Sequence, residues 1–319
     1  MERTFIRRLR TWYRFKTRLI MNEKINNIEQ ICSIKRLKYI SGRAKDIEIL
    51  LVNNGVFTFE LLVDKCLDIG ALYHKGTNIS FLTAGGLNSA EKEFDANFNG
   101  GFLYTCGLDT IGGRAMPIHG RIHNIPAEVI KAEVTENGVE IVGIIKQSSL
   151  FGEKLTLKRT IKTGVNSSEL EVADEIINDG YSNAEYCIMY HTNFGYPMLD
   201  SGVTVTAPIT STVPRNDYAK KVVDGCFVID EPKADNEETV YFHTVKKGDI
   251  TVKNEKLNKS VTITYNEEIL PYFIEWKSMV SGAYALGIEP ATTTLDGDFA
   301  KKTIKPKESV KTGIKVKFN

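Results

Sequence analysis

The chain has 319 residues, of which 42% are hydrophobic and 25% are charged, a composition typical of globular proteins. Its 41 lysines and arginines nearly balance its 40 aspartates and glutamates, which gives a net charge of +1. This balance excludes the global basic field that nucleic-acid-binding proteins carry, so we expect no nucleic-acid partner. No apolar run in the sequence is long enough to cross a bilayer, so we expect no membrane span.

The length fits one large all-β domain or two ordinary domains, with a core that can fold without disulfides or a metal. Five cysteines are scattered along the chain without any Cys-x-x-Cys pair: Cys32, Cys66, Cys106, Cys187 and Cys226. This spacing argues against a disulfide framework and against a cysteine-rich zinc site. We therefore expect unpaired, mostly buried thiols and a reducing, cytoplasmic location.

Residues 1–20 differ from the rest of the chain because they carry seven basic residues and a single acid, Glu2. Their apolar residues fall near helical spacing, so one interpretation is a basic amphipathic helix that binds a surface. The interpretation we favour is a solvated basic extension, because charge runs are usually solvated. The expected organisation is therefore an extension over residues 1–20 and a single domain over residues 21–319.

From Ile47 onward the pattern is that of strands. Asn53-Asn54-Gly55 separates two β-rich runs, residues 47–52 and 56–63, and predicts a hairpin. Apolar and acidic residues largely alternate over residues 169–176, as in a half-buried strand. Short helices or helical turns are expected only within residues 21–40 and 84–99.

Other β-rich runs follow one another to the C-terminus, at residues 101–106, 129–135, 139–147, 154–162, 184–190, 203–208, 222–229, 239–245, 250–254, 260–265, 272–277, 282–289 and 309–318. Many short strands with Gly, Asn and Asp turns predict a mainly β fold with a large antiparallel sandwich or barrel. No regular alternation with helices supports a parallel α/β sheet.

The segment from Tyr190 to Pro197 reads Tyr-His-Thr-Asn-Phe-Gly-Tyr-Pro. In an extended strand His191 and Asn193 lie on the same face. A histidine with an amide and aromatic rings, at a strand end before a turn, suits a pocket for a polyhydroxylated ring. The alternative is a core strand with one satisfied histidine.

A second candidate segment runs from Pro117 to Pro126 and contains His119, Arg121 and His123 at alternate positions. If this segment is extended, all three side chains point the same way. Arginine offers fixed donors to hydroxyl or carboxylate oxygens, and histidine is suited to proton transfer near neutral pH. The alternative is a solvated strand face.

A third candidate lies near the C-terminus. An apolar strand ends in Glu289, followed by a proline. A carboxylate in apolar surroundings has a raised pKa, which a general base near neutral pH needs. Trp276 offers a flat face for the CH face of a sugar, and Lys277 follows it. The alternatives are an exposed strand-end acid and a core tryptophan.

The glycine-rich run from Asn99 to Asp109 allows tight turns and close backbone approach but is not a dinucleotide-binding motif. Nucleophile-elbow, phosphate-loop and zinc-ligand motifs do not occur. The pair His119 and His123 lacks a nearby acid or cysteine, so we expect neither a metal nor a cofactor.

Several segments taken together carry a family resemblance: Asp64-Lys65-Cys66-Leu67-Asp68-Ile69, Tyr73-His74-Lys75-Gly76, Asn99-Gly100-Gly101, Thr105-Cys106-Gly107-Leu108-Asp109, His119-Gly120-Arg121-Ile122, His191-Thr192-Asn193-Phe194-Gly195-Tyr196-Pro197 and Gly287-Ile288-Glu289-Pro290. In this order they resemble the aldose 1-epimerase (galactose mutarotase)-like superfamily, and more closely its DUF4432 branch. The resemblance extends from about Ile47 to the C-terminus. It implies a large antiparallel β-sandwich that binds sugars on a concave face.

The resemblance also implies roles for individual residues. In such mutarotases a histidine acts as general acid toward the ring oxygen, a glutamate acts as general base toward the anomeric hydroxyl, and a second histidine binds the substrate. These roles fall on His191, Glu289 and His119. The acid and base should then lie roughly 5–7 Å apart, flanking one ring. The substrate-binding candidates complete the set: Arg121, Asn193, Asp109, Trp276 and Lys277.

The chain departs from the family pattern in three ways. His191 is followed by Thr-Asn-Phe-Gly instead of Pro-Tyr-Phe-Asn, and Lys65-Cys66 stand where the branch has Arg-Gly. The substrate-binding aspartate between the acid and the base has no assignable position. The functions that remain open are a sugar mutarotase, a non-catalytic carbohydrate-binding protein on the same fold, and an isomerase or lyase acting on a sugar acid.

Overall fold

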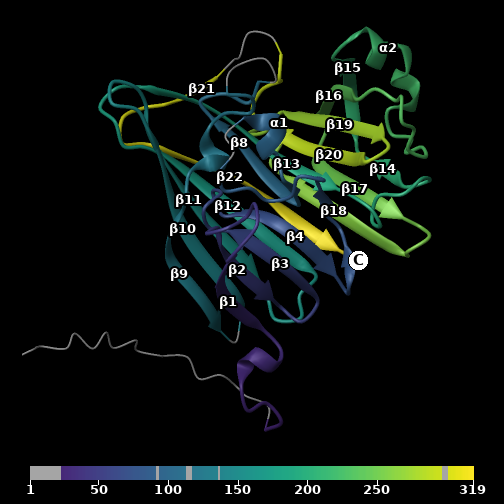
Figure 1. The fold of residues 1–319 in the computed structure, drawn as a ribbon. Helices are drawn as coiled ribbons and strands as arrows, with labels where there is room; N and C mark the ends of the chain where they lie inside the picture. The colour runs from purple at the N-terminus through teal and green to yellow at the C-terminus, as the bar shows by residue number, and fades with distance from the viewer. Residues whose placement is uncertain (1–22, 91–92, 113–116, 136, 297–300) are drawn as a thin grey trace, which may run out of the picture.

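The computed structural model describes residues 23–90, 93–112, 117–135, 137–296 and 301–319. As predicted, the chain is mainly β, and all of its strand pairings within the sheets are antiparallel (Figure 1). The predicted basic extension over residues 1–20 lies outside the described residues.

The longest sheet has eight strands and runs from β9 on the left of Figure 1 to β14 on the right. In spatial order they are β14 (Thr204–Thr206), β17 (Gly248–Asn254), β18 (Lys259–Tyr265), β22 (Ser309–Phe318), β12 (Glu169–Asn178), β11 (Lys154–Thr163), β10 (Gly138–Ser148) and β9 (Glu128–Thr135). Exposure alternates along β12, which confirms the half-buried strand predicted there.

The second large sheet has seven strands and carries the residues discussed below. In spatial order they are β15 (Ile209–Pro214), β16 (Thr239–Val245), β19 (Tyr272–Val280), β20 (Ala283–Ala291), β13 (Ala184–Phe194) and β21 (Lys302–Ile304), and β8 (Leu103–Leu108) also pairs with β13. Neighbouring strands in this sheet come from distant parts of the sequence, so the sheet brings together residues that no short motif links.

Two smaller sheets complete the sandwich. One contains β1 (Ser33–Lys38), β2 (Glu48–Asn53), β3 (Phe57–Leu62), β4 (Asp68–His74) and β5 (Thr77–Asn78), and the other contains β6 (Phe81–Leu82) and β7 (Gly100–Gly101). The predicted hairpin joins β2 to β3. Its glycine, Gly55, has φ +92°, and a Cβ there would approach Asn166 Oδ1 to 2.2 Å, so the turn requires glycine.

The helices are short: η1 (Ile28–Gln30), α1 (Phe94–Asn97), η2 (Ile122–Asn124), α2 (Asp217–Lys221) and η3 (Val223–Gly225). Within the described part of the chain, no helix is long and apolar enough to cross a membrane.

The strand predicted over residues 222–229 is wrong, because helical turns occupy its first half. Asn216 starts this helical region by accepting a hydrogen bond from Ala219 N at 2.8 Å, as an N-cap residue does. Strands β1, β15 and β21 were not predicted from the sequence.

The large core between the sheets contains a buried ion cluster centred on Arg159. Its guanidinium lies 2.6 Å from Asp68 Oδ1 of β4 and 2.7 Å from Asp174 Oδ2 of β12, and all three side chains are fully buried. Tyr190 of β13 donates to Asp174 at 2.9 Å. The cluster therefore joins three sheets, and it fixes β13 one residue before His191. Removing one partner of such a cluster typically costs about 3–5 kcal/mol, because the others stay buried and charged.

All five cysteines are free, four of them buried and Cys226 half-buried, which confirms the prediction of unpaired thiols.

Candidate active site

A cavity of about 240 Å³ lies over one face of the seven-stranded sheet. Its polar lining includes His119, His191, Arg215 and Glu289, and its apolar lining includes Phe94, Phe98 and Trp276. The volume lies just below the range of about 300–1,000 Å³ that is usual for ligand pockets. The cavity therefore suits a small ligand of about the size of a single six-membered ring.

The register of three neighbouring strands brings the central residues together. Thr192 of β13 lies opposite Ile288 of β20, so His191 and Glu289 form the next cross-strand pair. Trp276 of β19 lies opposite Gly287, two residues before Glu289 and on the same face. A Cβ on Gly287 would lie 2.3 Å from Glu289 Oε1. The glycine therefore leaves the space that the carboxylate occupies.

His191 and Glu289 are in direct contact. Nε2 of the histidine lies 3.2 Å from Oε1 of the glutamate, and the two side chains are 5% and 1% exposed. This distance is shorter than the roughly 5–7 Å that we expected for groups flanking a ring. Among the described residues, neither His191 Nδ1 nor Glu289 Oε1 has a hydrogen-bond partner. Each of the two buried groups thus has a polar atom that makes no hydrogen bond, which is uncommon for buried polar groups.

Burial shifts both groups toward their neutral forms. Desolvation raises the pKa of Glu289 well above its usual range, with Glu238 adding to the rise and Arg215 opposing it. Desolvation lowers the pKa of His191 well below its usual range, and His119 lowers it further, while the amide of Asn193 opposes the fall. Both shifts favour the uncharged pair, in which the proton lies on Glu289 and the His191 ring is neutral.

His119 sits on a tight turn and not on an extended strand. It has φ +60° and the following Gly120 has φ +77°. The prediction that His119, Arg121 and His123 point the same way is therefore wrong. Nδ1 of His119 lies 3.0 Å from the carbonyl oxygen of Ile111 and must donate to it, which leaves Nε2 as an acceptor. Burial lowers the pKa of His119 to about 4, so the ring is neutral at physiological pH.

Aromatic rings surround the two histidines. Phe98 lies 5.7 Å and Trp276 lies 5.6 Å from His191, measured between ring centroids. Phe94 packs edge-on against His119 at 4.9 Å. Trp276 is held by a hydrogen bond from Nε1 to Glu238 at 2.8 Å. These rings lower the polarity around His191 and offer flat surfaces to a ligand.

Three charged residues of the lining were not predicted from the sequence: Asp95 of α1, Arg215 and Glu238. Arg215 donates from Nε to Asp296 at 2.5 Å, and it lines the cavity together with Glu238. Arg215 follows strand β15 and Glu238 precedes β16, at positions where the sequence contains no recognisable motif. Only the pairing of β15 with β16 and β19 brings them to the site.

Four predicted substrate-binding residues do not line this cavity: Arg121, Asp109, Lys277 and Asn193. The Nε of Arg121 lies 2.6 Å from Asp109 Oδ2, and the same guanidinium also pairs with Glu153, so Arg121 and Asp109 are engaged with each other. Lys277 points to the opposite face of β19 from Trp276, where its Nζ donates to the carbonyl oxygens of residues 225, 226 and 228 at 2.8–3.0 Å.

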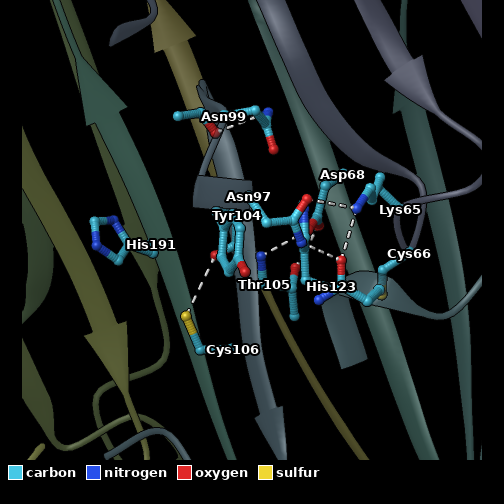
Figure 2. Close-up of polar contacts among 12 residues, drawn as sticks. Lys65, Cys66, Asp68, Asn97, Asn99, Tyr104, Thr105, Cys106, His123 and His191 are labelled. Carbon is cyan, nitrogen blue, oxygen red and sulfur yellow. Dashed lines mark hydrogen bonds and ion pairs between the residues drawn. The ribbon is translucent and has the colours of Figure 1, made fainter. Parts of the chain in front are cut away.

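Two residues lie behind the cavity. Asn193 is fully buried beside His191 and donates to the histidine's carbonyl oxygen at 3.1 Å. His123 is also buried, with Nδ1 2.6 Å from Asp68 Oδ2, and its ring stacks on Tyr104 at 3.6 Å (Figure 2). Tyr104 in turn lies opposite His191 in the β8–β13 register. These residues can position His191 without touching a ligand.

The fold and this site together define a class of protein, an antiparallel β-sandwich with a buried histidine–carboxylate pair in a small cavity. A family model described as a domain of unknown function, DUF4432, matches residues 44–317. The chain belongs to the DUF4432 family. Among curated protein sequences, none matches the chain.

Solved structures agree on the fold. A proposed aldose 1-epimerase from Klebsiella pneumoniae subsp. pneumoniae MGH 78578 is 21% identical, with a TM-score of 0.82 over 92% of this chain and 86% of its own. A galactose mutarotase-like protein from Clostridium acetobutylicum is 15% identical, with a TM-score of 0.69 over 91% and 99% of the two chains. A proposed mutarotase from Salmonella typhimurium is 12% identical, with a TM-score of 0.66 over 92% and 95%. At these identities the comparison establishes a shared fold and not a shared activity.

Proposed function

We propose that this protein is a carbohydrate-active isomerase of the aldose 1-epimerase type, which interconverts the anomers of a small sugar without a cofactor. The observation that carries the proposal is the contact of 3.2 Å between His191 Nε2 and Glu289 Oε1 inside the cavity. Similarity to proteins described as aldose 1-epimerases and mutarotases supports it.

Anomerisation needs one proton removed from the anomeric hydroxyl and one proton delivered to the ring oxygen, followed by the reverse steps on the other face. A pair of groups that together hold one proton can do both, since one accepts while the other donates. The family assignment makes His191 the acid and Glu289 the base. Burial favours the proton on Glu289 in the free protein, so this assignment requires the proton to pass from Glu289 to His191 when the sugar binds. The sugar must enter between them, so binding has to separate Nε2 from Oε1. Opening a contact that lacks good hydrogen-bond geometry costs little.

Other residues would bind and orient the sugar. His119 Nε2 can accept a hydrogen bond from a sugar hydroxyl, because its Nδ1 already donates to Ile111. Trp276 presents a ring face to the apolar side of the pyranose. Asp296 holds the Nε edge of Arg215, and the remaining guanidinium donors can meet sugar oxygens.

We also propose a cytoplasmic location, which the five free cysteines support.

Saturation-transfer NMR against a panel of aldoses and uronic acids tests the proposal, combined with exchange spectroscopy between the two anomers. We expect saturation transfer to at least one sugar and exchange faster than in buffer. Saturation transfer without faster exchange would instead indicate a carbohydrate-binding protein. Solvent deuterium entering a C–H position would indicate carbon-acid chemistry, as in an isomerase or lyase.

A further inference from the structure

Helix α1 and its C-cap supply Phe94 and Phe98 to the lining of the cavity, and we call these two rings the aromatic wall. The helix is too short to be stable by itself. It has only four residues, and its N-cap, Glu93, makes no side-chain capping bond. An isolated helix this short is unstable in water, so contacts with the rest of the protein must hold it. Phe94 and the C-cap residue, Phe98, contact His119 and His191 respectively. The position of this short helix therefore sets the environment of both histidines.

Asn97 is the only buried residue of α1, and it anchors the helix to Lys65. Lys65 Nζ donates to Asn97 Oδ1 at 3.1 Å and to Asn124 Oδ1 at 2.7 Å, and Asn97 Nδ2 donates to Asn124 Oδ1 at 2.8 Å. In Figure 2 Lys65 reaches toward Asn97, on the side of Tyr104 away from His191. The three side chains form a closed triangle, which we call the Lys65 node.

The third residue of the Lys65 node, Asn124, belongs to the segment that contains His119. Asn124 ends η2, which follows His119-Gly120-Arg121. The backbone reinforces this link, since Cys66 N donates to Ile125 O at 3.0 Å. Among the described residues, α1 is also held by an exposed hydrogen bond from Arg43 Nη2 to Ala96 O at 3.2 Å, and Thr83 Oγ1 donates to the carbonyl oxygen of its C-cap, Phe98, at 2.9 Å. Lys65 is thus a buried connection between the two segments that supply the aromatic rings and the second histidine, and it bonds to both asparagines of the direct Asn97–Asn124 contact.

We propose that Lys65 is a positioning residue that holds α1 and the His119 turn together over the cavity, and so controls the access and orientation of the ligand. Its side chain is only 6% exposed, and a buried ammonium group is tolerated where carbonyl oxygens satisfy its donors. Burial lowers the pKa of Lys65 to about 8, with Asp64 opposing the fall. The catalytic part of this inference rests on the proposed function, while the structural part does not.

Tryptophan fluorescence gives a test that is independent of catalysis. The chain has two tryptophans, so Trp12→Phe leaves Trp276 as the only reporter. Phe98 lies 6.2 Å from Trp276. In this background we expect Lys65→Met, Asn97→Ala and Asn124→Ala each to shift the emission of Trp276 in the free protein, and Lys65→Arg to restore it. Asn124 is exposed, so its variant should fold even if the other two do not.

The matched control is Asn54→Ala. Asn54 is also fully buried and holds three acceptors, Thr163 Oγ1 and the carbonyl oxygens of Gly164 and Ser167, but in the β2–β3 turn. We expect this variant to lower the melting temperature and leave the emission unchanged.

With an active sugar, Lys65→Met should lower kcat/KM by roughly 10- to 100-fold, as misplaced groups do, and Lys65→Arg should recover most of it. Lys65 variants that behave like Asn54→Ala, losing stability with no change in emission or kinetics, would overturn the proposal. A wild type without isomerase activity would contradict the proposed function but leave the fluorescence test intact.

Discussion

Two buried histidine–glutamate pairs occur on opposite faces of the seven-stranded sheet. His191 of β13 contacts Glu289 of β20 at 3.2 Å, and His243 of β16 contacts Glu275 of β19 at 3.0 Å. Ile274 lies opposite Glu289, so the next residue, Glu275, faces the other way. The two pairs consist of the same residue types on the same sheet and differ in their surroundings.

The second pair is fully buried, and both of its histidine nitrogens have partners, although Glu275 Oε1, like Glu289 Oε1, has none among the described residues. Nδ1 of His243 lies 2.9 Å from Thr212 Oγ1, and the ring of Phe227 stacks on the imidazole at 5.2 Å. In contrast, His191 Nδ1 has no partner within the described ranges, and the first pair lines a cavity. A histidine beside a glutamate therefore does not define a catalytic site by itself. What distinguishes the first pair is an open space and groups left free to exchange a proton with a ligand.

The largest expected effect comes from replacing the two histidines in parallel. His191→Gln should lower the anomerisation rate by about 10²–10⁴-fold, the usual contribution of a positioned acid or base. His243→Gln should lower the melting temperature, because it disturbs a buried hydrogen-bond network, and leave the rate per folded molecule near that of the wild type. Polarimetry on folded samples measures both rates. Equal losses of rate in the two variants would show that the pairs are not functionally distinct.

A smaller effect is expected from Gly287→Ala, which acts on the first pair alone. The added Cβ would lie 2.3 Å from Glu289 Oε1, so the carboxylate must move. The moving group is the end of a flexible side chain, so we expect little loss of stability but a loss of roughly 10- to 100-fold in rate. Gly282→Ala is a steric control because a Cβ there meets nothing within 4 Å, although its φ of +86° adds backbone strain. An unchanged rate in Gly287→Ala would mean that the position of the carboxylate is unimportant.

The smallest effect concerns stability as a function of pH. The folded protein keeps the proton on Glu289 well above pH 4.5, whereas the unfolded chain releases it near that pH. Stability is therefore lost as pH rises from 4.5 toward the raised pKa. Glu289→Gln does not titrate, so we expect its melting temperature to rise relative to that of the wild type as pH increases above about 4.5. Calorimetry at several pH values measures this difference, and a constant difference would contradict the raised pKa.

The sequence allowed much of the fold and the centre of the site to be predicted. Turn residues and β-rich runs indicated an antiparallel sandwich, and the motif resemblance selected His191, Glu289 and His119. The cavity brings these three together with Trp276. Neither the pattern of residues nor the resemblance indicated the contribution of α1.

The errors have physical reasons. Arg121 was predicted to share a face with His119 because every second side chain of an extended chain points the same way. The left-handed backbone at His119 and Gly120 instead turns the chain there. Trp276 and Lys277 were both assigned to the pocket, although adjacent strand residues face opposite sides. Arg215 and Glu238 reach the cavity through the pairing of distant strands, which no local pattern contains.

The most direct test of the account compares two glutamate variants by NMR exchange spectroscopy with a sugar that the wild type binds. The wild type and Glu275→Gln should both show exchange between anomers, whereas Glu289→Gln should bind the sugar without exchange above the rate in buffer. Exchange in Glu289→Gln as fast as in the wild type, or no enhanced exchange in the wild type despite bound sugar, would contradict the claim that the His191–Glu289 pair carries the chemistry.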